Sequence, residues 1–467
     1  MTRTGILLFL LLFVSPLAAS DFQAGSALED ITPPLGVPLD GAISQNGPVV
    51  EIHDPPHVRA VAFSDGRETV VLATVDNTMI SGSIFDRAKE RIKKETGIPG
   101  SHIILAATHT HSTPRGMVGL VDDSAFDAYL DSLPAAIAKA VINATKNLQP
   151  AQIGWAGLSA PEHVHNRRWH VEPSAQIKNP FGEGGEVVRM NPGREGLIKP
   201  AGPVDPELTL LSVQTESGKP LSVMGNYGLH YVGGTGRGKV SADYFAVFSE
   251  AIGRLLEADE SFVGLMSNGT SGDVNAVDFS SPPPQKYAPF ENLKRIGEDL
   301  AERAAPVIRN IEHRKAKEIR AVEIILNLKV RKPDAERLAW AKETAAPPNS
   351  PLRLTRTQVY AREALALSSY PDMVEVKLQA IRIDDFAVVG IPCEVFAETG
   401  LAIKEAEVFP HTIVMELANG YHGYLPTAQQ HEWGGYETWP ARSACLEEGA
   451  ESEIRKAAIQ LLKQLRD

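Results

Sequence analysis

The chain of 467 residues has the composition of an ordinary globular protein, with 43% hydrophobic and 22% charged residues. Its formal net charge of −12 argues against nucleic acid or an anionic membrane as the main partner. Length alone would permit two or three domains, but no shift in composition divides the chain after its N-terminal segment.

The N-terminus has the pattern of an export signal. Arg3 supplies a positive charge, residues 5–14 form a short apolar core, and residues 18–20 are the small residues of a cleavage site. We therefore predict a signal peptide over residues 1–20, a single domain over residues 21–467, and a secreted or periplasmic protein. The alternative is an uncleaved anchor, which the shortness of the apolar core disfavours.

Strand and helix patterns alternate along the rest of the chain. In order, the pattern predicts strand 69–75, helix 85–96, strand 103–107, helix 125–148 with a break at Pro134, strands 208–213 and 221–225, helix 243–256, strand 262–266, helix 293–311, strand 319–330, helix 334–343, strands 374–383 and 386–391, helix 395–406, strand 412–417 and helix 450–465. This alternation predicts an α/β fold with a mixed sheet core flanked by helices. Residues 172–206, rich in Gly, Pro and Asn, are too long for an ordinary connection and predict a functional loop or a rim element.

Polar side chains follow several of these strands at the point where each strand ends. The residues concerned are His109 and His111, His230, Asn268 and Asp273, Glu394, and Tyr424. If the strands share a sheet, their ends meet at one crevice. Two histidines, a carboxylate and a tyrosine then come within reach of one cation. Such a set suits Zn²⁺, which keeps a position open for water in catalytic sites.

Each of these features also has an ordinary structural interpretation. The His109/His111 pair could be one core histidine and one surface histidine, and Glu394 could cap the helix that follows it. Asn419-Gly420 is a turn signal. Cys393 and Cys445 could form one disulfide in an exported protein or remain two thiols.

A series of ordered motifs resembles the neutral/alkaline (non-lysosomal) ceramidases, specifically their N-terminal catalytic domain. Residues 106–114 match the family motif A-T-H-T-H-S-G-P. Further matches follow in order at residues 166–168 (N-R-S), 204–207 (V-D-[KP]-E), His230 (H-G-T), 268–275 (N-x-G-D-V-S), 392–395 (P-G-E-F), 424–427 (Y-V-T-T) and 436–437 (Y-E).

The resemblance implies a zinc amidase that splits the N-acyl bond of ceramide, with a lipid or other small molecule as substrate and peripheral membrane contact. It implies His109, His230, Glu394 and Tyr424 as zinc ligands. It also implies that His111, Arg167 and Tyr436 line the site and hold the substrate carbonyl or the product carboxylate.

The chain departs from the family pattern at two places. Asn275 stands where the family has a serine, so we expect catalysis of the same kind with an altered substrate preference. After the matched motifs the chain has no room for the family's C-terminal β-sandwich, so we expect a single catalytic domain. The alternatives are a zinc amidase or esterase for a different acylated molecule, and a non-catalytic binding protein that keeps the fold.

Overall fold

The computed structural model describes residues 22–39, 47–118, 123–283, 285–346 and 354–467. The predicted export signal lies outside these ranges and stays a prediction. Among the described residues, no helix combines the length and the apolar character that crossing a membrane requires.

The largest element of the fold is an eight-stranded mixed sheet in the order β14-β12-β11-β6-β1-β3-β4-β5. Its strands are β1 (Gln23–Asp30), β3 (His57–Ser64), β4 (Thr69–Val75), β5 (Ile103–Ala107), β6 (Gln149–Ser159), β11 (Glu207–Thr215), β12 (Pro220–Tyr227) and β14 (Val263–Asn268). Neighbours run antiparallel except at the two edges, where β4 and β5 pair in parallel, as do β12 and β14.

A second, four-stranded sheet has the order β16-β17-β18-β20. Its strands are β16 (Ile319–Lys329), β17 (Met373–Ile383), β18 (Phe386–Gly390) and β20 (His411–Met415). The two sheets share one hydrophobic core, in which Leu72 and Ile104 of the first sheet belong to the same cluster as Ile381 and Val388 of the second. Burial of these apolar faces is the main force that holds the sheets together.

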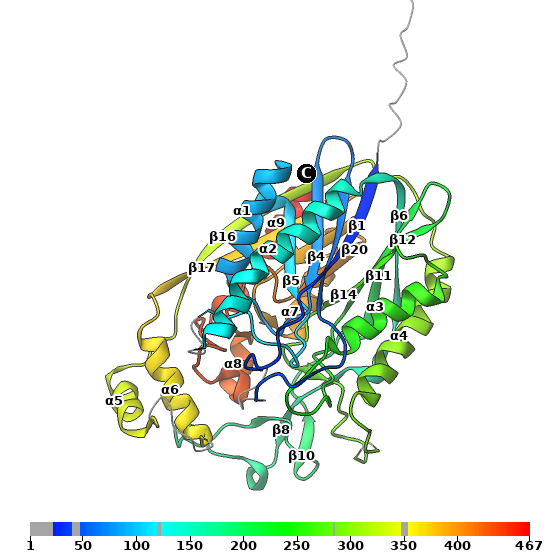
Figure 1. The fold of residues 1–467 in the computed structure, drawn as a ribbon. Coiled ribbons are helices and arrows are strands. Elements are labelled where there is room, and N and C mark those ends of the chain that lie inside the picture. The colour runs from blue at the N-terminus through cyan, green and yellow to red at the C-terminus, as the bar shows by residue number, and fades with distance from the viewer. Residues whose placement is uncertain (1–21, 40–46, 119–122, 284, 347–353) are drawn as a thin grey trace, which may run out of the picture.

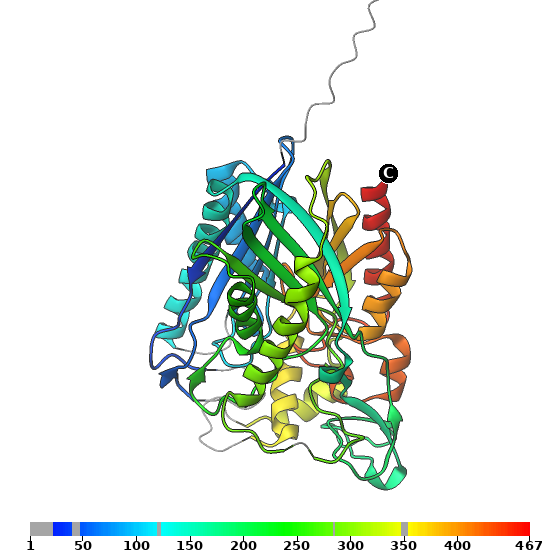
Figure 2. The same cartoon turned by 90° about the vertical axis from the view of Figure 1, so that its right-hand side faces the viewer.

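Helices cover the outer face of each sheet and complete four layers (Figures 1 and 2). The first sheet carries α1 (Gly82–Thr96), α2 (Ser124–Lys146), α3 (Asp243–Leu255) and α4 (Glu291–Arg309). The second carries α7 (Ala397–Glu405) and α9 (Ala450–Arg466), and α9 lies at the right of Figure 2.

Shorter elements gather at one end of the layers, at the bottom of Figure 1. They are α5 (Ala335–Thr344), α6 (Arg356–Ser368), α8 (Ala428–Trp433), β2 (Glu51–Ile52), β7 (His165–Asn166), β8 (Arg168–Val171), β9 (Val188–Met190), β10 (Leu197–Pro200), β13 (Lys239–Val240), β15 (Val274–Asn275), β19 (Glu394–Val395) and β21 (Tyr424–Leu425), with 3₁₀ turns at Pro161–His163, Pro173–Ala175 and Tyr436–Thr438. A further 3₁₀ turn, Gly100–His102, precedes β5 at the opposite end of that strand. The 172–206 segment contributes two strands to the β10-β8-β9 sheet and is thus a rim element.

The predicted α/β fold with a mixed sheet core is confirmed, and three details differ. Helix α2 continues through Pro134. Although proline removes one backbone hydrogen bond, Leu130, Leu133 and Ile137 pack into one core on both sides of it, and this packing holds the helix together. The strands with polar ends lie in two sheets, not one, and the pattern missed β1, β3, β6 and α6.

The two cysteines are free thiols in the core beside the second sheet. Of the two alternatives for Cys393 and Cys445, the structure has the unpaired one, with the Cys445 Sγ 3.2 Å from the carbonyl oxygen of His422.

Candidate metal centre and its cavity

The strand ends that carry the polar residues meet at one place although they come from two sheets. Backbone contacts close the junction, because Ala107 N donates to Leu417 O over 3.2 Å and Asn419 N donates to Leu105 O over 2.7 Å. The end of β5 and the segment after β20 therefore run together. Glu394 lies in β19, which follows β18 along the chain. It pairs there with Tyr424 in β21.

Three histidines and one glutamate form a compact cluster at this junction. The His109 Nε2 atom lies 3.0 Å from His230 Nε2, 3.2 Å from His111 Nε2 and 3.3 Å from Glu394 Oε2. The Glu394 Oε2 atom also lies 3.8 Å from His230 Nε2. Four donors arranged as a tetrahedron around Zn²⁺ at 2.0–2.1 Å would lie roughly 3.3 Å from one another. The spacings among His109, His230 and Glu394 fit three corners of this arrangement.

Hydrogen bonds of the Nδ1 atoms decide which ring nitrogen of His109 and of His230 carries the proton. His109 Nδ1 lies 2.6 Å from the carbonyl oxygen of Thr78, and His230 Nδ1 lies 3.0 Å from that of Ser271. A carbonyl only accepts, so each Nδ1 carries the proton and each Nε2 presents a lone pair.

Glu394 Oε2 is buried and has no hydrogen-bond partner. Lone pairs and an unpaired carboxylate oxygen at 3.0–3.8 Å repel unless a cation lies among them. The residues present therefore fit a metal ion, and His109, His111 and His230 form a group that could hold one.

Burial keeps two histidines of this group neutral. It lowers the pKa of both His111 and His230 well below the usual value, and Arg167 lowers both further. For Glu394, burial alone would raise the pKa, but His109 and Arg167 outweigh it and the pKa is lowered. Neutral imidazoles beside an ionised carboxylate are the protonation states that metal binding requires.

The backbone at His109 is held in an unusual conformation. Its φ of 75° lies in the left-handed region, which costs a residue other than glycine about 1 kcal/mol or more. The peptide bonds around it are fixed, because Thr108 N donates to Val75 O and His109 N donates to Asn77 O, both over 2.9 Å. Such strain is typical of functional sites.

Arg167, Tyr424 and Tyr436 line the same cavity as the cluster. The Arg167 guanidinium donates to Glu437 Oε1 over 2.9 Å and to Gly272 O over 2.8 Å, and its Cζ lies 5.4 Å from the centre of the Tyr424 ring. The Tyr424 and Tyr436 rings are 5.7 Å apart. Burial, with Glu394, raises the pKa of both tyrosines, which keeps their hydroxyls protonated as donors.

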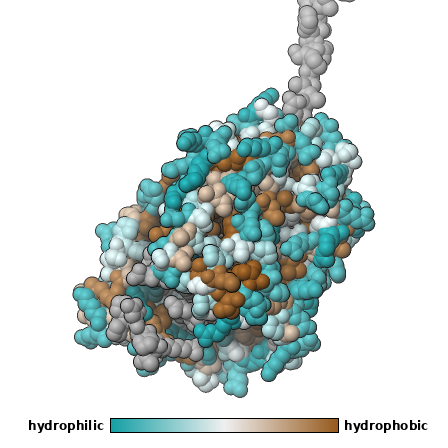
Figure 3. Space-filling view, in the orientation of Figure 1, coloured by the Kyte–Doolittle hydropathy of each residue, from teal (hydrophilic) through white to brown (hydrophobic). Residues whose placement is uncertain are grey.

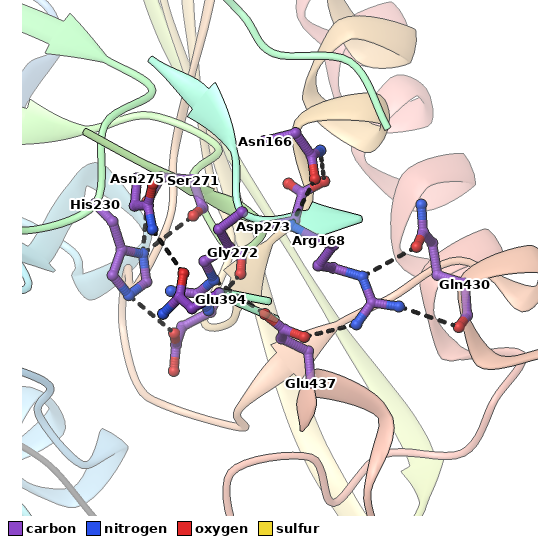
Figure 4. Close-up of polar contacts among 12 residues, drawn as sticks. Asn166, Arg168, His230, Ser271, Gly272, Asp273, Asn275, Glu394, Gln430 and Glu437 are labelled. Carbon is purple, nitrogen blue, oxygen red and sulfur yellow. Dashed lines mark hydrogen bonds and ion pairs between the residues drawn. The ribbon is translucent and has the colours of Figure 1, made fainter. Parts of the chain in front are cut away.

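Asn275 takes a different place from the other predicted site residues. Its side-chain amide donates to Asn191 Oδ1 over 2.8 Å, and Asn191 lines the cavity whereas Asn275 does not. Figure 4 shows how Asn275, His230, Ser271 and Glu394 lie relative to one another. A contact of Asn275 with substrate would therefore pass through Asn191.

The cluster opens into a cavity of about 640 Å³. We call His109, His230 and Glu394 its floor. We call its wall the lining residues of α6 and of the segments around Tyr370 and Arg442, namely Val359, Tyr360, Glu363, Ala366, Ser369, Tyr370, Ala441 and Arg442. Glu363 binds Arg442 through both carboxylate oxygens, at 2.6 and 2.9 Å. The face of the molecule drawn in Figure 3 is mainly hydrophilic, and its hydrophobic residues lie in separate patches.

Sequence reasoning gave no role to several residues that build the site. Tyr421 donates to Glu394 Oε1 over 2.8 Å, and its position in the run 419–424 was the signal that could have marked it. Glu363 lies in α6, which the pattern did not predict, and Thr78 contributes only a carbonyl. Every residue has a backbone carbonyl, so the residue type cannot indicate which carbonyl accepts this hydrogen bond.

The fold and the floor define an α/β protein with a buried histidine–carboxylate centre suited to a metal. No family model matches the chain. In sequence it is similar to neutral ceramidase A of Dictyostelium discoideum, at 25% identity over 45% of this chain, and to neutral ceramidase B of the same organism, at 24% identity over 45% of this chain. These matches span 29% and 28% of the curated relatives' own length.

In structure the chain is similar to neutral ceramidase from Pseudomonas aeruginosa, with a TM-score of 0.68 at 15% identity over 96% of this chain and 75% of that one. It is also similar to a ceramidase complexed with C2, with a TM-score of 0.69 at 17% identity over the same shares. At such identities the likeness shows a shared fold. Together with the sequence matches, it confirms the resemblance to the neutral ceramidases that the motifs predicted.

Proposed function

We propose that the protein is a zinc-dependent hydrolase that cleaves an N-acyl amide bond, with ceramide-like lipids as the first substrates to test. The observation that carries the proposal is the floor, where a buried carboxylate oxygen without a partner faces two imidazole lone pairs. The likeness to two curated neutral ceramidases supports the reaction class.

In this proposal His109, His230 and Glu394 hold the zinc ion together with Tyr424, the fourth ligand that the resemblance implies. His111, whose Nε2 lies 3.2 Å from His109 Nε2, is left free to move protons. When bound, a zinc ion would polarise the substrate's carbonyl group and lower the pKa of a water molecule bound to it. Arg167 and Tyr436 offer donors to the substrate's carbonyl oxygen. His111, a neutral imidazole at the edge of the floor, can accept the proton that the attacking water loses and then give it to the amine nitrogen as the amide C–N bond breaks.

The cavity lining favours a second candidate, a hydrolase of a polar acylated molecule. The wall presents Tyr360, Tyr370, Glu363 and Arg442, and the rest of the lining adds Arg115, Arg167 and Tyr231 to the apolar Met79, Met117, Val118 and Met190. A two-chain lipid is better matched by aliphatic side chains. A substrate with polar groups near the amide would instead find hydrogen-bond partners on this wall.

Metal analysis and a substrate series test the proposal together. The purified protein is expected to contain one transition-metal ion per chain, to lose hydrolysis on chelation and to regain it with Zn²⁺. Ceramide, an N-acyl amino acid and an O-acyl ester of equal chain length rank the two candidates by kcat/KM. Protein without stoichiometric metal, or metal-loaded protein that hydrolyses none of the three substrates, would contradict the proposal and favour a non-catalytic binding protein.

We also propose export, on the N-terminal pattern of residues 1–20. N-terminal sequencing of the mature protein from the secreted or periplasmic fraction is expected to give a first residue near Asp21. An intact Met1 would contradict cleavage.

A further inference from the structure

Glu416 is a buried carboxylate directly behind the floor, at the end of β20. Its exposed fraction is 0%, and it does not line the cavity. Three donors meet it: Val395 N over 2.8 Å and Ser271 N over 3.2 Å, both at Oε2, and Ser271 Oγ over 2.6 Å at Oε1. The side chain thus joins three segments that are distant in sequence.

Both partners of Glu416 lead directly to members of the floor. Ser271 is the residue whose carbonyl accepts the Nδ1 proton of His230, a contact drawn in Figure 4. Val395 follows Glu394, and its carbonyl accepts from Gly272 N over 2.8 Å. One carboxylate therefore sets the position of the carbonyl that orients His230 and of the backbone that carries Glu394.

We propose that Glu416 is a positioning residue that holds His230 and Glu394 in register for metal binding, an inference that rests on the proposed metal function. The side-chain hydrogen bonds of Glu416 go to Ser271 and Val395, so in this role it acts through these two residues. Outer contacts of this kind fix the tautomer and direction of a metal-binding histidine. Glu416 extends that control to a second ligand.

Geometry, not charge, is the property that this role requires. Burial raises the pKa of Glu416 well above its usual value, against the opposing contacts from Ser271. Glutamine can keep all three contacts, because its carbonyl oxygen can accept from the two backbone N–H groups that now share Oε2. Its NH₂ group can donate to Ser271 Oγ, since a hydroxyl can accept as well as donate.

Metal titration of the full-length apo protein separates this role from a general structural one. Zn²⁺ is titrated against a chromogenic chelator, and Co²⁺ absorption reports the coordination geometry. Glu416→Ala is expected to bind Zn²⁺ about 10- to 100-fold more weakly, with an altered Co²⁺ spectrum. Glu416→Gln is expected to stay within about threefold of wild type. If the alanine variant does not fold, Glu416→Asp replaces it, because its shorter side chain cannot reach both partners.

Glu451→Ala is the matched control. Glu451 is 4% exposed and accepts from Thr399 Oγ1 and Arg455 Nε, away from the floor. It is expected to lose stability and keep its metal affinity. Wild-type affinity for Zn²⁺ in Glu416→Ala would overturn the proposal and leave the proposed function standing. A glutamine variant that binds Zn²⁺ as weakly as the alanine variant would have the same consequence. Wild-type protein that binds no metal would instead overturn the proposed function and this inference with it.

Discussion

The floor and the wall of the cavity are built in different ways. The floor residues His109, His230 and Glu394 are each 1% exposed, and strand ends with many backbone contacts fix them. On the wall, the side chains of Glu363 and Arg442 are 18% and 34% exposed, and they come from a helix and a loop outside the two sheets. The floor is rigid and chemically specific, whereas the wall is partly solvated and polar.

This difference separates two properties that an enzyme of this kind needs. Chemistry requires donors held within a few tenths of an ångström, which the two packed sheets provide. Substrate choice depends on surfaces that can vary without loss of the fold, which the wall provides. Substitutions in the floor should therefore change metal binding and catalysis, and those in the wall should change substrate preference.

Removal of a floor histidine is the change with the largest expected effect. His109→Ala deletes the donor at the centre of the cluster, so bound metal is lost and the rate falls by about 10³-fold or more, since a Lewis acid supplies several kcal/mol. Elemental analysis and kcat/KM measure both. The control His163→Ala removes another buried histidine, paired with Asp299 at 2.7 Å, and keeps the metal. Metal retained by His109→Ala would place the centre elsewhere.

A buried acid that supports the floor carries a pH dependence of stability. Asp273 accepts from Ala397 N over 2.9 Å and from Asn166 Nδ2 over 2.7 Å, and burial raises its pKa to about 6. The folded state then binds the proton more tightly than the unfolded state. Its contribution to the free energy of unfolding is greatest below about pH 4 and falls by about 3 kcal/mol as the pH rises to about 6.

Asp273→Asn removes this titration and tests the assignment. Urea unfolding from pH 4 to pH 7 is expected to show a smaller loss of stability with rising pH in the variant than in the wild type. The difference in slope between the two proteins isolates Asp273 from other titrating groups. Parallel curves would mean that Asp273 has an ordinary pKa in the folded protein.

The floor could be predicted from the sequence and the wall could not, for a physical reason. The apolar β-branched runs that end at His109, Glu394 and Tyr424 are strong strand signals, and the motifs that follow them are specific. The pattern missed α6, in which apolar and polar residues are mixed and whose buried residues, apart from Leu367, pack in small clusters outside the main cores. Strands β1 and β6 were missed because small and polar residues interrupt their alternation.

The prediction that the polar strand ends meet at one place was correct, but it assumed a simpler arrangement of the sheets. One sheet was expected to bring the strand ends together, but β5 and β12 belong to one sheet and β18 and β20 to another. The face-to-face packing of two sheets depends on contacts between residues far apart in sequence, which periodicity does not encode. Buried supports such as Glu416 and Asp273 were out of reach for the same reason.

A change in the wall should alter substrate preference and leave the metal in place. Glu363→Gln weakens the two-oxygen contact with Arg442, so KM for polar substrates is expected to change about tenfold, the scale of one partly exposed charged hydrogen bond. Metal content is expected to stay at the wild-type value. Asp372→Asn, in an ion pair whose aspartate is 87% exposed, serves as the control and should change neither. Loss of metal in Glu363→Gln would break the division between floor and wall.

Substitution of Asn275, which contacts the cavity-lining residue Asn191 and does not itself line the cavity, is expected to give the smallest effect. Serine is too short to reach Asn191 Oδ1, so Asn275→Ser releases one neutral side-chain contact and frees the Asn191 side chain, whose backbone φ of 47° is already unusual. The effect reaches substrate only through Asn191, so we expect KM to change by about threefold and kcat to stay constant. Steady-state kinetics on ceramide and on an N-acyl amino acid measure the split. A tenfold change in kcat would show that Asn275 acts with the floor. A change in the ratio of kcat/KM between the two substrates would confirm the altered preference expected at a position where the ceramidase motif has serine.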